Sequence, residues 1–158
     1  MPLEAVLIDQ DALQRGSEAQ RVDWEASIRG LLDQAVCAID EPVTLLITPM
    51  ERQFALRFER ADGSEIFNAV VDHDLLRDQI SDYLDIVRQI TDADSLNQME
   101  ALDMAKKVTH DRAGRILKRA LRPVGFDLET SRRLFTLLLS LKVDTTRLPG
   151  VYGHRRLR

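Results

Sequence analysis

The densest group of side chains able to do chemistry is basic and lies between residues 106 and 122. Seven lysines and arginines fall within these 17 residues, against one acid, Asp111. At 100° per residue, a helix would bring four of the seven onto one broad solvent face. Such a face can follow a phosphate backbone or meet an acidic protein surface. The four residues are Lys107, Arg115, Lys118 and Arg122, whereas Lys106 lies off the face.

The C-terminal end of the chain adds further positive charge. Arg155, Arg156 and Arg158 close the segment 144–158, which also contains Pro149 and two glycines. We therefore predict one folded domain over residues 1–143 and a flexible basic tail over residues 144–158. The three tail arginines join the four helical residues as candidate contacts to a partner or to nucleic acid. No aromatic residue is interleaved in 106–122 to stack on bases, which argues against single-strand recognition of that kind.

No recognised catalytic motif occurs in the chain. The seven glycines are scattered and do not form a loop between a strand and a helix, so no phosphate-binding loop is expected. Neither a G-x-S-x-G elbow nor an H-E-x-x-H pair is present. The three histidines, at positions 73, 110 and 154, fall on three different predicted elements. We predict no catalytic residue and no cofactor, and an enzyme with a motif-free pocket is kept as a third hypothesis.

The nearest approach to a metal-binding cluster is the run Asp72, His73 and Asp74. Adjacent residues at the start of a helix point in different directions, so one ion would not easily collect all three. We interpret Asp72 as a helix N-cap with two first-turn neighbours, and we predict no metal site. Trp24 and Cys37 are interpreted as residues of the core or its boundary.

Hydrophobic patterning predicts four strands. The run at residues 54–59 alternates apolar and polar side chains, which is typical of a half-buried strand. Asp62 and Gly63 supply a turn, and residues 66–71 return as the partner strand of a hairpin. Two shorter apolar runs, at residues 3–8 and 43–48, predict the other strands.

Capping patterns predict four helices. Ser17 with Gln20, and Ser95 with Gln98, have the spacing of a capping box. The first helix would run from Ser17 to about residue 39 and follow a loop at residues 9–16. The second would start at Asp72, the third would run from residue 95 to about 121 with Gly114 at a close helix crossing, and the fourth would start at Asp127. The fold class is therefore α+β, with a small antiparallel sheet (N-terminal strand, one strand and a central hairpin) packed against about four helices.

Length and composition indicate one globular domain. The 158 residues include 44% hydrophobic and 30% charged side chains, an ordinary globular mixture. The single cysteine cannot form an internal disulfide, the N-terminus lacks the features of a signal peptide, and the apolar stretches are too short to span a bilayer. We expect a cytoplasmic protein with no membrane association.

Charge is divided unevenly along the chain. Residues 1–105 hold 22 of the 26 acidic residues, and residues 106–158 hold 14 of the 22 basic ones. The simplest interpretation is that the two halves face each other, within the fold or across a homodimer. The leading functional hypothesis is a non-enzymatic interaction or regulatory module that binds an unidentified protein partner through its acidic or its basic helical face. The alternative is a nucleic-acid- or ribosome-associated factor whose affinity falls steeply with salt.

Two segments of the C-terminal half resemble a known family. The run EALDMAKK at residues 100–107, followed by His110, and the run FDLETSRRLFTL at residues 126–137 are similar to an uncharacterised protein family of alphaproteobacteria. The hairpin through residues 58–67 and the stretch 78–83 are also similar, so the resemblance covers most of residues 1–143. The chain departs from the family pattern where typical members have an arginine pair in place of Lys106 and Lys107, and glycine near Ala105 and Val108. The resemblance implies a bacterial, cytoplasmic origin and assigns no activity or site.

Overall fold

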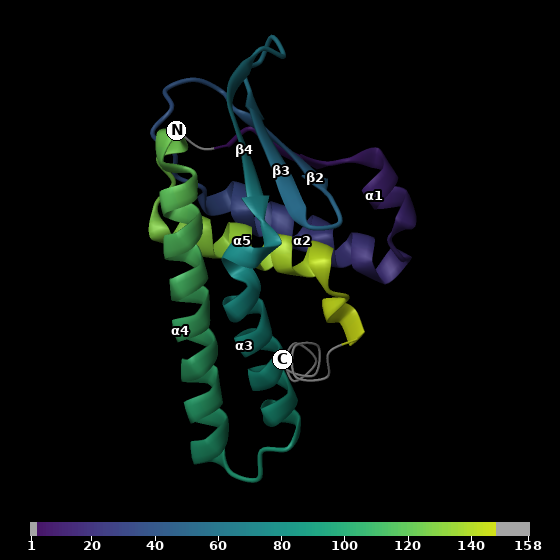
Figure 1. Cartoon of the computed structure of the whole chain (residues 1–158), viewed down its shortest axis with the longest axis vertical. Helices are drawn as coiled ribbons and strands as arrows, with labels where there is room; N and C mark the ends of the chain where they lie inside the picture. Colours follow the sequence, from purple (N-terminus) through teal and green to yellow (C-terminus); the bar gives the residue numbers. More distant parts are fainter. Residues whose placement is uncertain (1–2, 148–158) are drawn as a thin grey trace.

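Within residues 3–147, the range that the structure describes, a computed structural model shows four strands and five α-helices (Figure 1). This confirms the predicted α+β class. In chain order the elements are β1 (Ala5–Ile8), α1 (Gln10–Arg15), α2 (Glu18–Gln34), β2 (Thr44–Pro49), β3 (Gln53–Glu59), β4 (Glu65–Asp72), α3 (His73–Thr91), α4 (Leu96–Ala120), a 3-10 turn (Arg122–Val124), α5 (Leu128–Lys142) and a second 3-10 turn (Thr145–Arg147).

The four strands form a single mixed sheet in the order β1-β2-β3-β4. The pairs β2–β3 and β3–β4 are antiparallel, and Leu45 pairs with Phe58, which pairs with Phe67. Strand β1 instead runs parallel to β2, with Val6 opposite Leu45. The expectation of a purely antiparallel sheet was therefore wrong at this pair. The physical reason is the connection between the two strands. Helices α1 and α2 return the chain to the end of the sheet at which β1 starts, so β2 can run in the same direction as β1.

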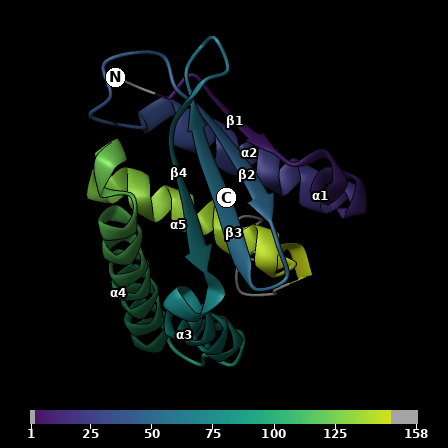
Figure 2. The same ribbon diagram turned by 45° about the horizontal axis from the view of Figure 1, so that its top comes forward.

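One face of the sheet is buried and carries the core. Every second side chain of the central strands is fully enclosed, including Leu45, Leu56 and Phe58. Helices α2 and α5 lie side by side behind this face (Figure 2). Trp24 of α2 is buried, and its indole Nε1 donates a hydrogen bond to the Ser140 carbonyl of α5 at 3.0 Å. This confirms that Trp24 belongs to the core, as predicted.

The predicted N-caps are confirmed at four helices. Ser17 and Gln20 form a complete capping box, with each side chain bonded to the other's backbone. At the start of α4, Ser95 accepts a bond from the Gln98 amide, but the Gln98 side chain accepts from the Asp94 amide, so only half of the predicted box forms. The other two caps are the carboxylates of Asp72 and Asp127, which accept from backbone amides of α3 and α5.

The prediction of a loop at residues 9–16 was wrong, because residues 10–15 form helix α1. This helix has six residues, and its N-cap Asp9 makes no side-chain capping bond. Ala12 is buried and Leu13 packs against the core, so tertiary burial stabilises a helix too short to show a periodic pattern.

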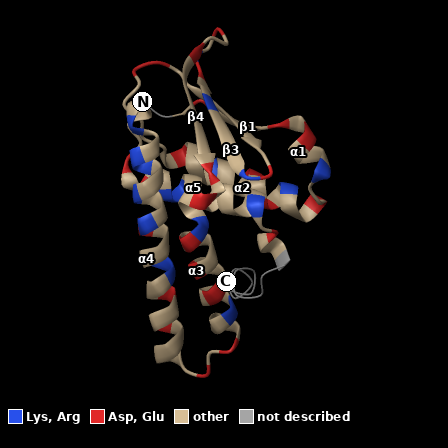
Figure 3. Cartoon of the chain, viewed as in Figure 1, with Lys and Arg blue, Asp and Glu red and all other residues tan. Residues whose placement is uncertain are grey.

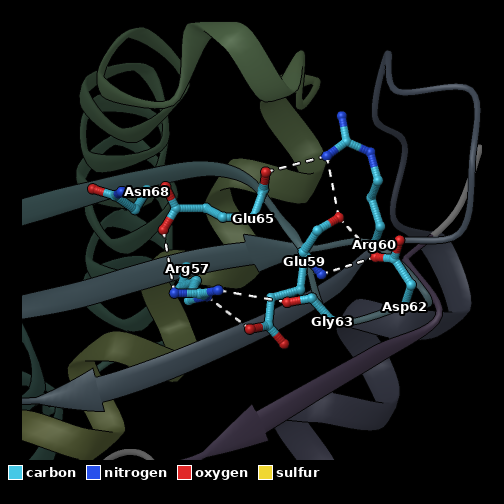
Figure 4. Close-up of polar contacts among 8 residues, drawn as sticks. Arg57, Glu59, Arg60, Asp62, Gly63, Glu65 and Asn68 are labelled. Atoms are coloured by element: carbon cyan, nitrogen blue, oxygen red, sulfur yellow. Dashed lines mark hydrogen bonds and ion pairs between the residues drawn. The ribbon is translucent and has the colours of Figure 1, made fainter.

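The predicted hairpin is confirmed, and charged side chains form ion pairs and hydrogen bonds near its turn (Figure 4). Arg57 on β3 pairs with Glu59 at 2.7 Å and with Glu65 on β4 at 3.4 Å. Gly63 has a φ of 86°, which a turn residue without a Cβ adopts at low cost. Asp62 accepts bonds from the amide and the hydroxyl of Ser64 and closes the turn.

Helices α4 and α5 cross closely at Gly114, as predicted. A Cβ at this glycine would lie 2.8 Å from Arg132 Cγ and 3.1 Å from Leu128 Cδ1. Cys37 is buried in the segment after α2, which confirms its interpretation as a core or boundary residue. Among the helices of residues 3–147, none combines the length and the apolar character that crossing a membrane requires.

Candidate functional site

Four cationic side chains line one surface hollow at the end of α4. The hollow has a volume of about 620 Å³. Gly125, Phe126 and Asp127, which connect α4 to α5, line it on the other side. We call this site the basic hollow, and its cations are Arg115, Lys118, Arg119 and Arg122.

The connection between α4 and α5 fixes the shape of the basic hollow. Helix α4 ends one residue before a 3-10 turn that contains Pro123, and Gly125 then takes a left-handed conformation with φ 70°. The Gly125 amide donates to the Arg122 carbonyl at 3.0 Å, and the Ala38 amide donates to the Val124 carbonyl at 2.9 Å. The chain therefore reverses within a few residues and is tied to the segment after α2.

The four cations of the basic hollow are all exposed to solvent. Within residues 3–147, none of the four takes part in an ion pair. The one acid at the rim, Asp127, uses its carboxylate to cap α5 by accepting from the Thr130 amide at 2.8 Å. By contrast, Arg132 on α5 pairs with Asp111 at 3.0 Å and with Glu129 at 3.1 Å. Figure 3 shows the resulting concentration of basic residues on the C-terminal half of α4.

The structure brings together three of the four helical residues predicted from the sequence, namely Arg115, Lys118 and Arg122. Lys107 lies two turns earlier, about 12 Å along the axis from Arg115, and does not line the hollow. Arg119 lines it although the helical projection did not select this residue. Lys106 turns toward α3, with its Nζ 5.9 Å from the centre of the Tyr83 ring, which agrees with its predicted place off the basic face.

The tail arginines at positions 155, 156 and 158 lie outside the described residues. The chain after α5 is described through residue 147, and Thr145 is buried there. Its hydroxyl donates to the buried carboxylate of Asp23 on α2 at 2.9 Å.

A second hollow, of about 650 Å³, lies where the start of α3 meets the end of α5. His73 lines it, and its ring packs against Phe54 with centroids 4.6 Å apart and ring planes tilted by 53°. The Lys142 ammonium donates to His73 Nδ1 at 2.6 Å, so the imidazole must be neutral to accept. Burial, and then the charge of Lys142, lower the pKa of His73 below its usual value.

In this second hollow, neither ring nitrogen of His73 is free to act as a base toward a substrate. Lys142 occupies His73 Nδ1, and Nε2 is enclosed by protein without a hydrogen-bond partner. Asp72 caps α3 by accepting from the Asp74 amide at 2.9 Å, which confirms its predicted role, and Asp74 pairs with Arg77. Within residues 3–147, no group of three or more His, Cys, Asp or Glu side chains is placed to hold a metal ion.

His110 is a partly buried histidine with a structural role. Its Nδ1 donates to the Lys106 carbonyl at 2.9 Å, one turn earlier on α4. The ring lies edge-on between Tyr83 of α3 and Phe135 of α5, at 5.4 Å from each ring centre. Burial lowers the pKa of His110. These contacts join three helices and leave His110 outside both hollows.

Comparison with known proteins agrees with the resemblance noted from the sequence. A family model described as "Uncharacterised protein family (UPF0262)" matches residues 2–144. A UPF0262 protein of Hyphomonas neptunium is 28% identical over 156 residues, covering 94% of this chain and 96% of the relative. A UPF0262 protein of Caulobacter vibrioides is 29% identical over 147 residues, covering 88% and 91%. No solved structure matches the chain. The chain belongs to this uncharacterised family, whose relatives here come from alphaproteobacteria.

Proposed function

We propose that this chain is a cytoplasmic, non-enzymatic binding module that docks an acidic segment of a partner protein in the basic hollow. One observation carries the proposal: four exposed cations line a single hollow, and none of them is paired with a counter-charge within the described part of the chain. An acidic segment would supply that counter-charge. Charge-assisted hydrogen bonds from guanidinium groups to carboxylates give such a contact both affinity and orientation.

Helix stability does not account for all four cations. Lys118 and Arg119 lie in the last turn of α4, where positive charge favours the helix dipole by about 0.3–1 kcal/mol per residue. Arg115 lies a turn earlier and Arg122 follows the helix, so neither belongs to that last turn. Their presence around the same hollow favours recognition of a ligand from outside the chain.

The geometry favours an acidic protein segment over nucleic acid. The helical segment from Arg115 to Arg122 covers about 10 Å of axis, which is short for a track along a phosphate backbone. Phe126, the aromatic residue of the hollow, is 2% exposed and offers no platform for stacking on a base. Lys107, which would have lengthened the basic face, does not line the hollow.

The non-enzymatic part of the proposal draws support from the second hollow. A general base must reach the proton that it abstracts, directly or through one water. Both nitrogens of His73 are withheld from such a proton, one by Lys142 and the other by enclosure. His73 is therefore not placed to act as a general base in that hollow.

The test is a comparison of two double variants of the full chain. Arg115→Glu with Arg119→Glu reverses charge in the basic hollow, and Arg15→Glu with Arg29→Glu reverses the same number of charges on α1 and α2. The probes are a glutamate-rich peptide and an RNA oligonucleotide of equal charge. We expect the peptide to bind the wild type and the control but not the hollow variant.

Affinity purification from the native cells, with and without nuclease, gives the second readout. A partner retained after nuclease by the wild type and control, and lost by the hollow variant, supports the proposal. Tighter binding of RNA than of peptide, or partners that disappear with nuclease, would replace it with the nucleic-acid alternative. Equal binding by both variants would show that the hollow is not the docking site.

A further inference from the structure

Helices α3 and α4 form an antiparallel hairpin that projects away from the sheet (Figure 1). Near the core, α4 buries Ala113 and Leu117. Over residues 96–108, the half of α4 toward the tip of the hairpin, no side chain is fully buried. On α3, the same half of the hairpin buries Val87 and Ile90. The open part is therefore the α4 side, whose apolar side chains are not fully covered by the same chain.

One open face of the hairpin is an apolar groove of about 550 Å³. Its α4 wall presents side chains at positions i, i+3, i+4 and i+7, the spacing of one helical face. Met104 is 59% exposed and Val108 is 41% exposed, whereas the solvent face of a surface helix is normally polar. We call this feature the hairpin groove, and its apolar residues are Ile86, Ala101, Met104, Ala105 and Val108.

The two rims of the hairpin groove carry opposite charge. Asp82 and Asp85 line it on α3, and Arg112 lines it on α4. Neither Asp82 nor Arg112 forms an ion pair within residues 3–147, whereas Asp85 pairs with Arg88 at 3.3 Å. The ring of Tyr83 on α3 contacts the ring of His110 on α4, and this contact sets the register of the hairpin. Because Asp82 and Arg112 are close in sequence to these two residues, they lie at similar heights along the helices, on opposite rims of the groove.

We propose that the hairpin groove docks a second copy of this chain. A two-fold axis parallel to the helices would place α3 of each copy over α4 of the other, with both hairpins pointing the same way. Asp82 of one copy would then meet Arg112 of the other at the same height, and the contact would occur twice. The alternative two-fold arrangement, α3 over α3, would set acid against acid and base against base. Charge complementarity therefore selects both the occupant and the orientation.

The first test is the oligomeric state of the purified full-length chain, measured by analytical ultracentrifugation over a dilution series. We expect a dimer that dissociates on dilution, and a Met104→Lys variant that is monomeric because it places a charge on the apolar α4 wall of the groove. Arg29→Asp on α2 is the matched control and should dimerise like the wild type. A wild type that stays monomeric at its highest soluble concentration overturns the proposal.

The second test exchanges charges and identifies the surface. Asp82→Arg and Arg112→Asp should each weaken dimerisation by at least about tenfold, because symmetry repeats the repulsion at two places. When the two variants are mixed, both contacts are again between opposite charges, so a one-to-one heterodimer should form. Circular dichroism checks that each variant is folded. Single variants that dimerise like the wild type, or a mixture that stays monomeric, would refute this interface.

Discussion

Replacing Gly125 with alanine should destabilise the protein through a backbone contact that can be located in the structure. Gly125 has φ 70°, where a residue with a Cβ costs about 1–2 kcal/mol more than glycine. The new Cβ would overlap the Cβ of Ala38 and lie 3.1 Å from its nitrogen and 3.3 Å from its Cα. None of these atoms belongs to a flexible side chain, so the backbone itself must move.

The expected loss follows from adding these two effects. Overpacking by one methyl group in a well-packed region typically costs about 1–3 kcal/mol. With the conformational cost, Gly125→Ala should lose about 2–5 kcal/mol of the free energy of unfolding. The same displacement would strain the 2.9 Å bond from the Ala38 amide to the Val124 carbonyl.

Gly63→Ala is the matched control, because it separates backbone strain from overlap. Gly63 also has a positive φ, of 86°, but no atom lies within 4 Å of its would-be Cβ at the hairpin tip (Figure 4). This variant should lose only about 1–2 kcal/mol. Urea denaturation followed by circular dichroism measures both losses. If Gly125→Ala loses no more than Gly63→Ala, the contact with Ala38 does not constrain the turn and the reasoning fails.

Two further predictions concern buried polar groups. Burial lowers the pKa of His110 below 6.5, so the unfolded chain binds more protons under acidic conditions, and the free energy of unfolding should fall as pH drops from 7 through 6.5. In the His110→Gln variant the free energy of unfolding should fall less steeply with pH, by at most about 1.4 kcal/mol per pH unit. Urea denaturation at several pH values measures this slope, and a slope equal to that of the wild type would contradict the prediction. Thr145→Val removes a hydrogen-bond donor from the buried Asp23 carboxylate and should lower the free energy of unfolding by about 1–3 kcal/mol. Thr44→Val on the sheet is the control and should change the free energy of unfolding little. If the two variants lose the same amount, the bond from Thr145 to Asp23 does not stabilise the fold.

Short-range patterns predicted most of the secondary structure. Ser17 and Asp127 were identifiable as caps because the bonds that satisfy a helix start join residues only two or three positions apart. The hairpin was identifiable because an alternating strand precedes Asp62 and Gly63 and a mostly apolar run follows them. In each case the information is contained within one element or one turn.

The direction of β1 and the existence of α1 depend on contacts that no local pattern records. Four residues of alternating burial fit a parallel or an antiparallel neighbour equally well, and the choice is made by the route of the connecting chain. The pair of His73 and Lys142 illustrates the same limit for a polar cluster, since the two residues are 69 positions apart. Their approach follows from where α3 starts and α5 ends.

Helix α4 shows why a periodic pattern cannot by itself separate folding from binding. One stripe of this helix packs on the chain itself at Ala113 and Leu117, while another carries the exposed apolar residues Met104 and Val108. The exposed side then becomes basic toward the C-terminal end, where Arg115 lines the basic hollow. Hydrophobic spacing predicts that a face will be covered, but not whether the same chain or another molecule covers it. The structure separates the two cases, because the half of α4 toward the hairpin tip extends beyond the core and its apolar side remains open.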